Sequence, residues 1–207
     1  MRIKRFLQLF LIGITTISAA AFIDLESSEA TQKFKEGDII FQTSSSGQSQ
    51  AIQLATHSEF SHVGIIFKQG DDWMVLEAVE PVQIIPIQQF ISRGDGGTYS
   101  LKRPKTALTA SQITGMKKLG KSWINTHYDI YFNWSDEELY CSELVWKLYS
   151  RAAKIDLCPL RELKSFDLTH PVVQHQLKKR YGKNIPYQEQ VVAPSDLFNS
   201  TLLVTIK

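Results

Sequence analysis

This sequence lacks a large excess of either charge, because 23 lysines and arginines are balanced by 21 aspartates and glutamates. The formal net charge at pH 7 is only +2. Domains that bind nucleic acid are usually strongly basic, since they neutralise phosphates. The charge balance therefore predicts that nucleic acid is not a partner. Internal repeats are also missing, which excludes a solenoid and predicts an ordinary folded domain.

Long apolar runs are absent after residue 20, so no later segment is expected to cross a membrane. The beginning of the chain is different. Residues 1–5 include three basic side chains, residues 6–17 are mostly apolar, and residues 18–20 are small. A basic start, a short apolar stretch and small residues after it are typical of a cleaved export signal.

We therefore predict that residues 1–20 are a signal peptide and that residues 21–207 form a single domain. The alternative is an uncleaved membrane anchor, although the apolar stretch is short for that purpose. No cysteine follows the stretch that could carry a lipoprotein anchor. The expectation is an exported protein, periplasmic or extracellular, with no stable membrane span after cleavage of the signal.

Cysteine is scarce, and the two present are Cys141 and Cys158. In an exported chain two cysteines can pair as a disulfide. The alternative is that Cys141 is a free, reactive thiol and that Cys158 is buried or incidental. The sequence around Cys141 favours the free thiol, because this cysteine lies at the front of an amphipathic helical pattern.

The first half of the chain is predicted to form short strands. Strands are expected at 39–41, 63–67, 73–78, 82–85 and 98–102, with one short helix at 50–56. The turn at residues 70–72 joins the second and third of these strands into a β-hairpin.

Helical spacing predominates in the second half. Apolar residues recur with the helical period over 113–124 and 144–152, and residues 171–181 are predicted to form a third helix. A closing strand is expected at 202–206. Strands followed by helices predict an α+β domain, with an antiparallel sheet packed against helices.

The start of the middle helix matters because it decides where Cys141 lies. Ser135 and Glu138 have the spacing of a capping box, which would start the helix six residues before the cysteine. The apolar stripe, however, begins only at Leu144. We therefore predict a helix that begins near Cys141.

A thiol and an imidazole on rigid elements are the minimum for a cysteine nucleophile and its base. Cys141 is expected at a helix N-terminus, and His62 precedes an apolar strand. A helix N-terminus carries partial positive charge and free N–H groups, which stabilise a thiolate and an oxyanion. The pattern predicts Cys141 as a nucleophile and His62 as its base.

A histidine base must also be oriented, which a carboxylate on its far nitrogen achieves. Glu77 interrupts an apolar strand, and the predicted hairpin pairs this strand with the one that follows His62. An acid at this position must be partnered or must face solvent. Two interpretations stay open: Glu77 orients His62, or it is an outward-facing strand residue.

The remaining histidines and the longest basic run are expected to be less informative. Each histidine of this group is predicted to be structural or solvated; they are His57, His127, His170 and His175. The run from Lys178 to Arg180 is predicted to be a solvated helix face.

Five segments match one known pattern in order: Gly37–Phe41, Ser61–Gly64, Leu76–Val79, Tyr128–Asp129 and Tyr140–Val145. Together they resemble the YiiX/YebB-like cysteine hydrolases, a circularly permuted branch of the NlpC-type cell-wall peptidases. The resemblance spans residues 37–195. It implies a papain-like fold whose halves are swapped in sequence, so that the histidine precedes the cysteine.

The resemblance also implies roles for four residues. Cys141 would be the nucleophile and His62 its base. Glu77 would orient the histidine, and Tyr128 would lie near the oxyanion. The non-permuted relatives have Asp-Cys-Ser-Gly where this chain has residues 140–143 as Tyr-Cys-Ser-Glu. This departure keeps the catalytic pair but leaves the peptide specificity open.

The leading expectation for residues 21–207 is a catalytic domain that cleaves an amide through an acyl-enzyme without a cofactor, with a cell-wall stem peptide as substrate. The same chemistry on lipid acyl groups is an alternative, since lecithin retinol acyltransferases share the permuted arrangement. An apolar cleft would favour the lipid and a polar cleft the peptide. A third hypothesis is a structural or zinc-binding envelope protein, although the tight spacing of usual zinc ligands is absent. Its ligands would be His57, His62, Glu77 and Cys141.

Overall fold

A six-stranded antiparallel sheet organises residues 34–207, the part of the chain that the computed structural model describes. The predicted signal peptide at 1–20 lies outside the described residues. The spatial order of the strands is β4-β3-β2-β1-β5-β8. Their bounds are β1 Ile39–Gln42, β2 His62–Gln69, β3 Asp72–Glu77, β4 Gln83–Pro86, β5 Ser100–Pro104 and β8 Leu203–Thr205. The predicted strands are thereby confirmed, with shifts of one or two residues at their ends.

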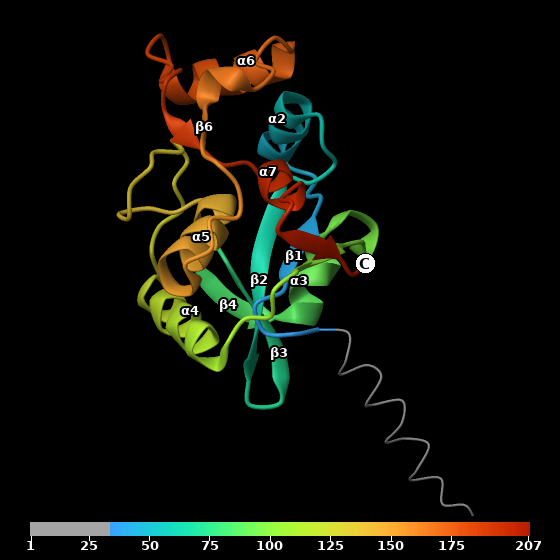
Figure 1. The fold of residues 1–207 in the computed structure, drawn as a ribbon. Coiled ribbons are helices and arrows are strands. Elements are labelled where there is room, and N and C mark those ends of the chain that lie inside the picture. The colour runs from blue at the N-terminus through green and yellow to red at the C-terminus, as the bar shows by residue number, and fades with distance from the viewer. Residues whose placement is uncertain (1–33) are drawn as a thin grey trace, which may run out of the picture. The chain divides into compact units, whose positions relative to one another are not determined.

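Helices cover both faces of this sheet, as Figure 1 shows. The helices of the described residues are α2 Gly47–Thr56, α3 Ile87–Arg93, α4 Ala110–Ser122, α5 Cys141–Leu148, α6 Pro171–Tyr181 and α7 Pro194–Phe198. Short helical turns are η1 Asp95–Gly97, η2 Tyr149–Ala153 and η3 Leu163–Ser165, and a separate two-stranded sheet pairs β6 Arg161–Glu162 with β7 Gln190–Val191. No helix between residues 34 and 207 combines the length and hydropathy that a membrane crossing requires.

The predicted hairpin of β2 and β3 forms the centre of the sheet. Ile65 pairs with Leu76 and Gln69 with Asp72, and Gly70 supplies the positive φ of 63° that the tight turn needs. Side chains alternate between the two faces, as a strand dictates. Val63, Ile65 and Phe67 pack in the core on the α5 side of the sheet, whereas Ile66 packs on the α3 side.

Gly64 lies between these alternating side chains, where two neighbours approach the backbone closely. A Cβ added to Gly64 would lie 2.4 Å from a Val75 methyl carbon and 3.3 Å from the Phe90 ring. Both contacts are tighter than ordinary van der Waals packing. The missing side chain therefore makes room for Phe90 beside the start of β2.

Helix α5 begins at Cys141, which confirms the prediction that it starts near the cysteine. The backbone N–H of Tyr140 donates to Glu143 Oε2 at 3.2 Å, so an acid inside the first turn fixes the helix start. Ser135 instead lies in a loop, where its hydroxyl accepts from the Glu137 N–H at 3.3 Å. The alternative start at Ser135 is therefore wrong. The helix continues as the π-helix η2 to Ala153.

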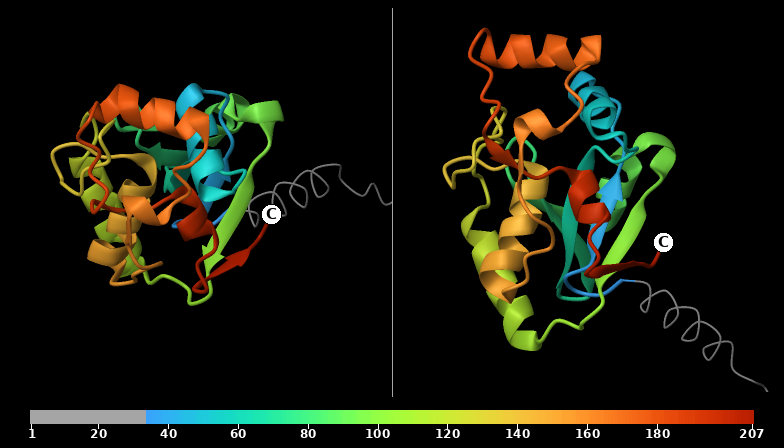
Figure 2. Two further views of the ribbon diagram at one scale, coloured as in Figure 1. Left: turned by 90° about the horizontal axis from the view of Figure 1, so that it is seen from above. Right: turned by 45° about the horizontal axis from the view of Figure 1, so that its top comes forward.

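Helices α2 and α6 pack together at the end of the sheet where β2 begins (Figures 1 and 2). Their shared apolar cluster contains Ala51 of α2, Val173 and Leu177 of α6, and Leu163. The observed bounds of α6 are those predicted, with His170 accepting from the Val172 N–H at 3.2 Å. The sequence did not predict α3 and α7, since helices of seven and five residues show too few repeats of the helical period.

Candidate active site

The thiol of Cys141 lies at the first position of α5 and is buried, with 3% of the residue exposed. Cys141 and Cys158 are both free, so the alternative of a disulfide between them is excluded. The first N–H groups of a helix have no partner inside the helix, and they carry the positive end of its dipole. The sulfur is therefore placed where an anion is stabilised.

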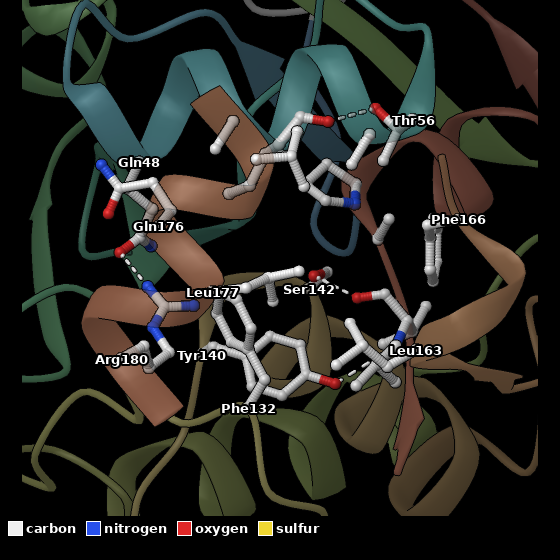
Figure 3. Close-up of a pocket in the computed structure, with 18 of the residues that line it drawn as sticks. Gln48, Thr56, Phe132, Tyr140, Ser142, Leu163, Phe166, Gln176, Leu177 and Arg180 are labelled. Carbon is white, nitrogen blue, oxygen red and sulfur yellow. Dashed lines mark hydrogen bonds between the residues drawn. The ribbon is translucent and has the colours of Figure 1, made fainter. Parts of the chain in front are cut away.

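Two hydrogen bonds to one residue hold the chain on either side of the cysteine. Ser142 donates its hydroxyl to the Val192 carbonyl at 2.7 Å, and the Val192 N–H donates to the Tyr140 hydroxyl at 3.2 Å. Both bonds are buried, and the first spans 50 residues of sequence. Figure 3 shows Tyr140 and Ser142 with these bonds. The segment before α7 thus fixes the position of Cys141.

His62, the first residue of β2, hydrogen-bonds with Cys141 on one side and with Glu77 on the other. Its Nε2 lies 2.7 Å from Glu77 Oε2, which leaves Nδ1 for the sulfur. Its ring stacks on Phe90 at 5.6 Å between centroids. Two polar partners and one ring therefore fix the imidazole.

The protonation of His62 follows from these contacts. Burial alone would lower the pKa of the imidazole, but the hydrogen bonds to Cys141 and Glu77, with their charges, outweigh it and raise the pKa to about 9. The ring is therefore protonated at neutral pH. A protonated imidazole beside a sulfur is the arrangement that stabilises a thiolate.

Glu77, at the end of β3, is completely buried, so the interpretation of an outward-facing strand residue is wrong. Its carboxylate accepts from His62, from Gln83 Nε2 at 3.0 Å and from Arg93 Nη2. Burial raises its pKa, yet these hydrogen bonds and the charges of His62 and Arg93 outweigh burial and lower it. Glu77 is therefore a carboxylate that orients a cationic His62.

Tyr128 lies close enough to Cys141 for the two groups to interact electrostatically. Burial, followed by the nearby Cys141, raises the pKa of its hydroxyl well above the usual value of 10. The hydroxyl therefore keeps its proton. The backbone N–H of Tyr128 donates to Glu80 Oε2 at 2.9 Å, which fixes the residue from the other side.

A hydrogen-bonded series connects the Tyr128 hydroxyl to α6. Gln48 Nε2 donates to Tyr128 Oη at 2.9 Å, and Arg180 Nη2 donates to Gln48 Oε1 at 3.0 Å. Arginine only donates, so it fixes which end of the Gln48 amide carries the oxygen. The Tyr128 oxygen then accepts from Gln48, and its own hydrogen is free to point elsewhere. This is the orientation that an oxyanion donor needs.

A pocket opens beside Cys141 between α2, α6 and the segment before α7 (Figure 3). Most of its lining is apolar, including Ala51, Ile52, Leu163, Leu168, Val173 and Leu177. One part is polar and is formed by Gln48, Gln176 and Arg180. The predicted site residues in its wall are Cys141 and Tyr128.

The sequence did not predict four residues that support this site. Arg93 and Gln83 support Glu77, but Arg93 lies on the unpredicted α3. Gln48 and Arg180 come from helices that pack together only in the folded chain, so no local pattern could have marked them. The basic run containing Arg180 was the only sequence signal present.

Three of the other histidines form contacts outside the Cys141–His62–Glu77 series. His57 pairs with Asp167 at 3.1 Å on the surface, and exposed His127 pairs with Glu80 at 2.7 Å. His170 caps α6. The expectation that these three histidines are structural or solvated agrees with their contacts.

Comparison with known proteins identifies the family. A model of the permuted papain-like amidases of the YaeF/YiiX group, family C92, matches residues 33–207. The chain is 44% identical over 170 residues to the protein YiiX of Escherichia coli strain K12, covering 82% of this chain and 84% of that protein. A solved structure, described as the metalloprotein YiiX of Escherichia coli O157:H7, superposes with a TM-score of 0.82 at 43% identity. The superposition covers 84% of this chain and 97% of the other.

These matches confirm the resemblance to the YiiX-type hydrolases, the α+β fold and its permuted papain-like order. The more distant relation to NlpC-type enzymes stays a prediction. The family model covers all described residues, and the identity to YiiX exceeds 40%, so the family is shown. The chain belongs to the YaeF/YiiX family of permuted papain-like amidases.

Proposed function

We propose that this protein is a cysteine amidase that works through an acyl-enzyme. The family is described as an amidase, which supports hydrolysis of an amide. The observation that carries the proposal is the hydrogen-bonded series from Cys141 through His62 to Glu77. A thiolate, a protonated imidazole and an orienting carboxylate are the three groups that a cysteine hydrolase needs.

In the first half of the reaction, the Cys141 sulfur attacks the amide carbon and forms a C–S bond, and the carbonyl oxygen becomes an oxyanion. The oxyanion accepts from the backbone N–H of Cys141 and from the hydroxyl of Tyr128. The C–N bond then breaks while His62 gives its proton to the leaving nitrogen. The products are a free amine and a thioester on Cys141.

In the second half, water attacks the thioester carbon while neutral His62 takes a proton from it. The C–S bond breaks, the carboxylic acid leaves, and the thiolate and imidazolium are restored. Glu77 stabilises the cationic ring in each state in which His62 holds the proton, because it stays a buried carboxylate.

For the substrate, we propose an amide of an apolar acyl chain. The mostly apolar lining of the pocket beside Cys141 supports this choice, because moving an apolar chain from water into such a pocket is favourable. A cell-wall stem peptide is the second candidate. The polar part formed by Gln48, Gln176 and Arg180 favours it, because a peptide needs hydrogen-bond partners for its polar groups.

We propose that the protein is exported and meets its substrate in the periplasm or outside the cell. The support is the pattern of residues 1–20, with a basic start, an apolar stretch and small residues. Fractionation of cells that produce the full chain, with N-terminal sequencing of the mature form, would test this. An uncleaved protein in the cytoplasm would contradict it.

A metal site was the third hypothesis, and a relative is described as a metalloprotein. The donor set does not fit here. Glu77 already accepts from three side chains, and His57 pairs with Asp167 away from His62. Residues 34–207 contain no group of three histidine, cysteine or acidic side chains arranged to hold a metal. Metal analysis of the purified protein would check this reading.

The amidase proposal is tested by supplying N-decanoyl amides and muropeptides to the purified protein. Mass spectrometry should detect decanoate release and a decanoyl adduct on Cys141. The Cys141→Ala variant should lose both signals. Cys158→Ala is the matched control, since burial raises the pKa of Cys158 to about 12 and makes its thiol unreactive. Cleavage that persists in Cys141→Ala would overturn the mechanism, and cleavage of muropeptides alone would favour the peptide substrate.

A further inference from the structure

The basic run at the end of α6 divides in the folded chain. Lys178 and Lys179 are exposed, as predicted, but Arg180 is half-buried and lines the pocket beside Cys141. The prediction of a solvated face is therefore wrong for Arg180. The cause is the helix period, which turns the third residue of the run toward α2 while its neighbours face water.

The partners of Arg180 are all neutral. Its guanidinium donates to Gln48, hydrogen-bonds with Tyr181 and lies 4.4 Å from the centroid of the Phe132 ring. Every other arginine among residues 34–207 forms an ion pair with a carboxylate: Arg93 with Glu77, Arg103 with Asp38, Arg151 with Asp136 and Arg161 with Asp196. Within residues 34–207, Arg180 is thus the arginine that forms no ion pair with a carboxylate.

The pocket itself offers no balancing charge. Among the described residues that line it there is no aspartate, glutamate or lysine, so Arg180 is its one permanently charged side chain. A guanidinium has five N–H donors and binds carboxylate or phosphate oxygens with two parallel bonds. Partial burial beside apolar side chains strengthens such a contact, because water screens it less.

The position of Arg180 indicates which part of a substrate would reach it. Arg180 and Phe166 lie on opposite sides of the pocket in Figure 3. Two hydrogen bonds, through Gln48, join Arg180 to the Tyr128 hydroxyl. A group bound at Arg180 would therefore lie near an amide held at Cys141 and Tyr128, and an apolar chain that follows the pocket away from Arg180 would extend toward Phe166.

We propose that Arg180 selects acyl amides that carry an anionic group near the scissile bond, such as an N-acyl amino acid. This inference rests on the proposed amidase function and adds the charge of the substrate to it. Carboxylate and phosphate share the chemistry that Arg180 recognises. A neutral fatty amide would leave the cation without a partner and would be the poorer substrate.

Binding to the full chain tests the inference without relying on catalysis. Isothermal titration would compare decanoate, decyl phosphate and decanol below their micellar concentrations. The anions should bind about tenfold to a hundredfold more tightly than decanol, which is the range for one charge-assisted contact. Arg180→Gln should abolish the preference, Arg180→Lys should keep part of it, and Lys179→Gln should keep all of it.

Hydrolysis supplies the second measurement. The substrates would be N-decanoyl-glycine, N-decanoyl-phosphoethanolamine and the neutral N-decanoyl-glycinamide. For each variant, kcat/KM for an anionic substrate is divided by kcat/KM for the neutral one. This ratio should fall about tenfold or more in Arg180→Gln, mainly because KM for the anionic substrate rises. It should be unchanged in Lys179→Gln. A response of only one anionic substrate would identify whether carboxylate or phosphate is preferred.

The two measurements separate failure of the inference from failure of the proposed function. Equal binding of decanoate, decyl phosphate and decanol, or a preference that survives Arg180→Gln with an unchanged Tm, overturns the role of Arg180. An anion preference that Arg180→Gln removes supports the role even if no amide is cleaved. In that case only the amidase proposal is lost.

Discussion

Two histidine–glutamate pairs in this protein have the same length and very different surroundings. Nε2 of His62 lies 2.7 Å from Glu77, and Nδ1 of His127 lies 2.7 Å from Glu80. The side chains of the first pair are 12% and 0% exposed, and those of the second are 75% and 59% exposed. Distance alone therefore does not distinguish the buried pair beside Cys141 from a surface contact.

The two pairs differ in burial and in the number of additional hydrogen-bond partners. Glu77 also accepts from Gln83 and Arg93, and His62 also contacts Cys141. Water screens the exposed pair, whose contribution to stability is expected to be small. The buried pair is fixed on every side, and its charges act in a medium of low polarity.

Removal of each imidazole should give the largest contrast. His62→Ala should lower kcat/KM about 10³- to 10⁴-fold, because the base and proton donor are lost together. Iodoacetamide should also label Cys141 more slowly at pH 6, since no cation stabilises the thiolate. His127→Ala should change either rate by about threefold at most. Equal losses in the two variants would remove the distinction between the pairs.

Neutralising each carboxylate gives the next largest effect. Glu77→Gln should lower kcat about 10²- to 10³-fold, because the amide neither stabilises the imidazolium nor fixes its tautomer. Glu80→Gln is the matched control, since its amide oxygen can still accept from the Tyr128 N–H. Steady-state kinetics and thermal unfolding of both variants would check this. Similar kinetics for the two variants would contradict the role of Glu77.

The stability of the buried pair should depend on pH. The pKa of His62 is raised to about 9 in the folded chain, from about 6.5 when unfolded. The stabilisation is therefore complete below pH 6.5 and is lost as the pH rises through 9, by about 3 kcal/mol at most. Urea unfolding between pH 6 and 9.5 should show this decrease in the wild type and a smaller one in His62→Gln. Parallel curves would count against a folded imidazolium.

The smallest effect is expected at Tyr128. The hydrogen-bond partner of its hydroxyl is the neutral amide of Gln48, whereas the partner of each histidine is a carboxylate. In Gln48→Glu the new carboxylate would accept the Tyr128 hydrogen and withdraw it from the oxyanion. The kcat should fall about tenfold with no loss of Tm, because a carboxylate can also pair with Arg180. The same change in a Tyr128→Phe background should have no further effect. A tenfold loss there as well would assign Gln48 another role.

The sequence predicted the framework of the site because that framework depends on local signals. Alternating apolar residues around Gly70 define the hairpin that carries His62 and Glu77. An apolar stripe beginning at Leu144 places Cys141 at a helix start. Five sequence segments, which include these three residues, then indicated the permuted family, and the family model confirms it.

The partners of these residues could not be predicted in the same way. Gln83, Arg93, Gln48 and Arg180 acquire their contacts from the packing of separate elements. A polar residue on a short helix has no periodic signature that distinguishes an inward position from a solvated one. The apolar pocket also depends on how α6 docks on α2, which local sequence does not record.

The hydrogen bonds from Val192 to the two neighbours of Cys141 have a consequence for biosynthesis. A growing chain makes Cys141 some fifty residues before it makes the residue that holds Tyr140 and Ser142 in place. A fragment that ends between Ser142 and Val192 lacks both of these hydrogen bonds. The segment around Cys141 can therefore take its final position only after residue 192 has been made.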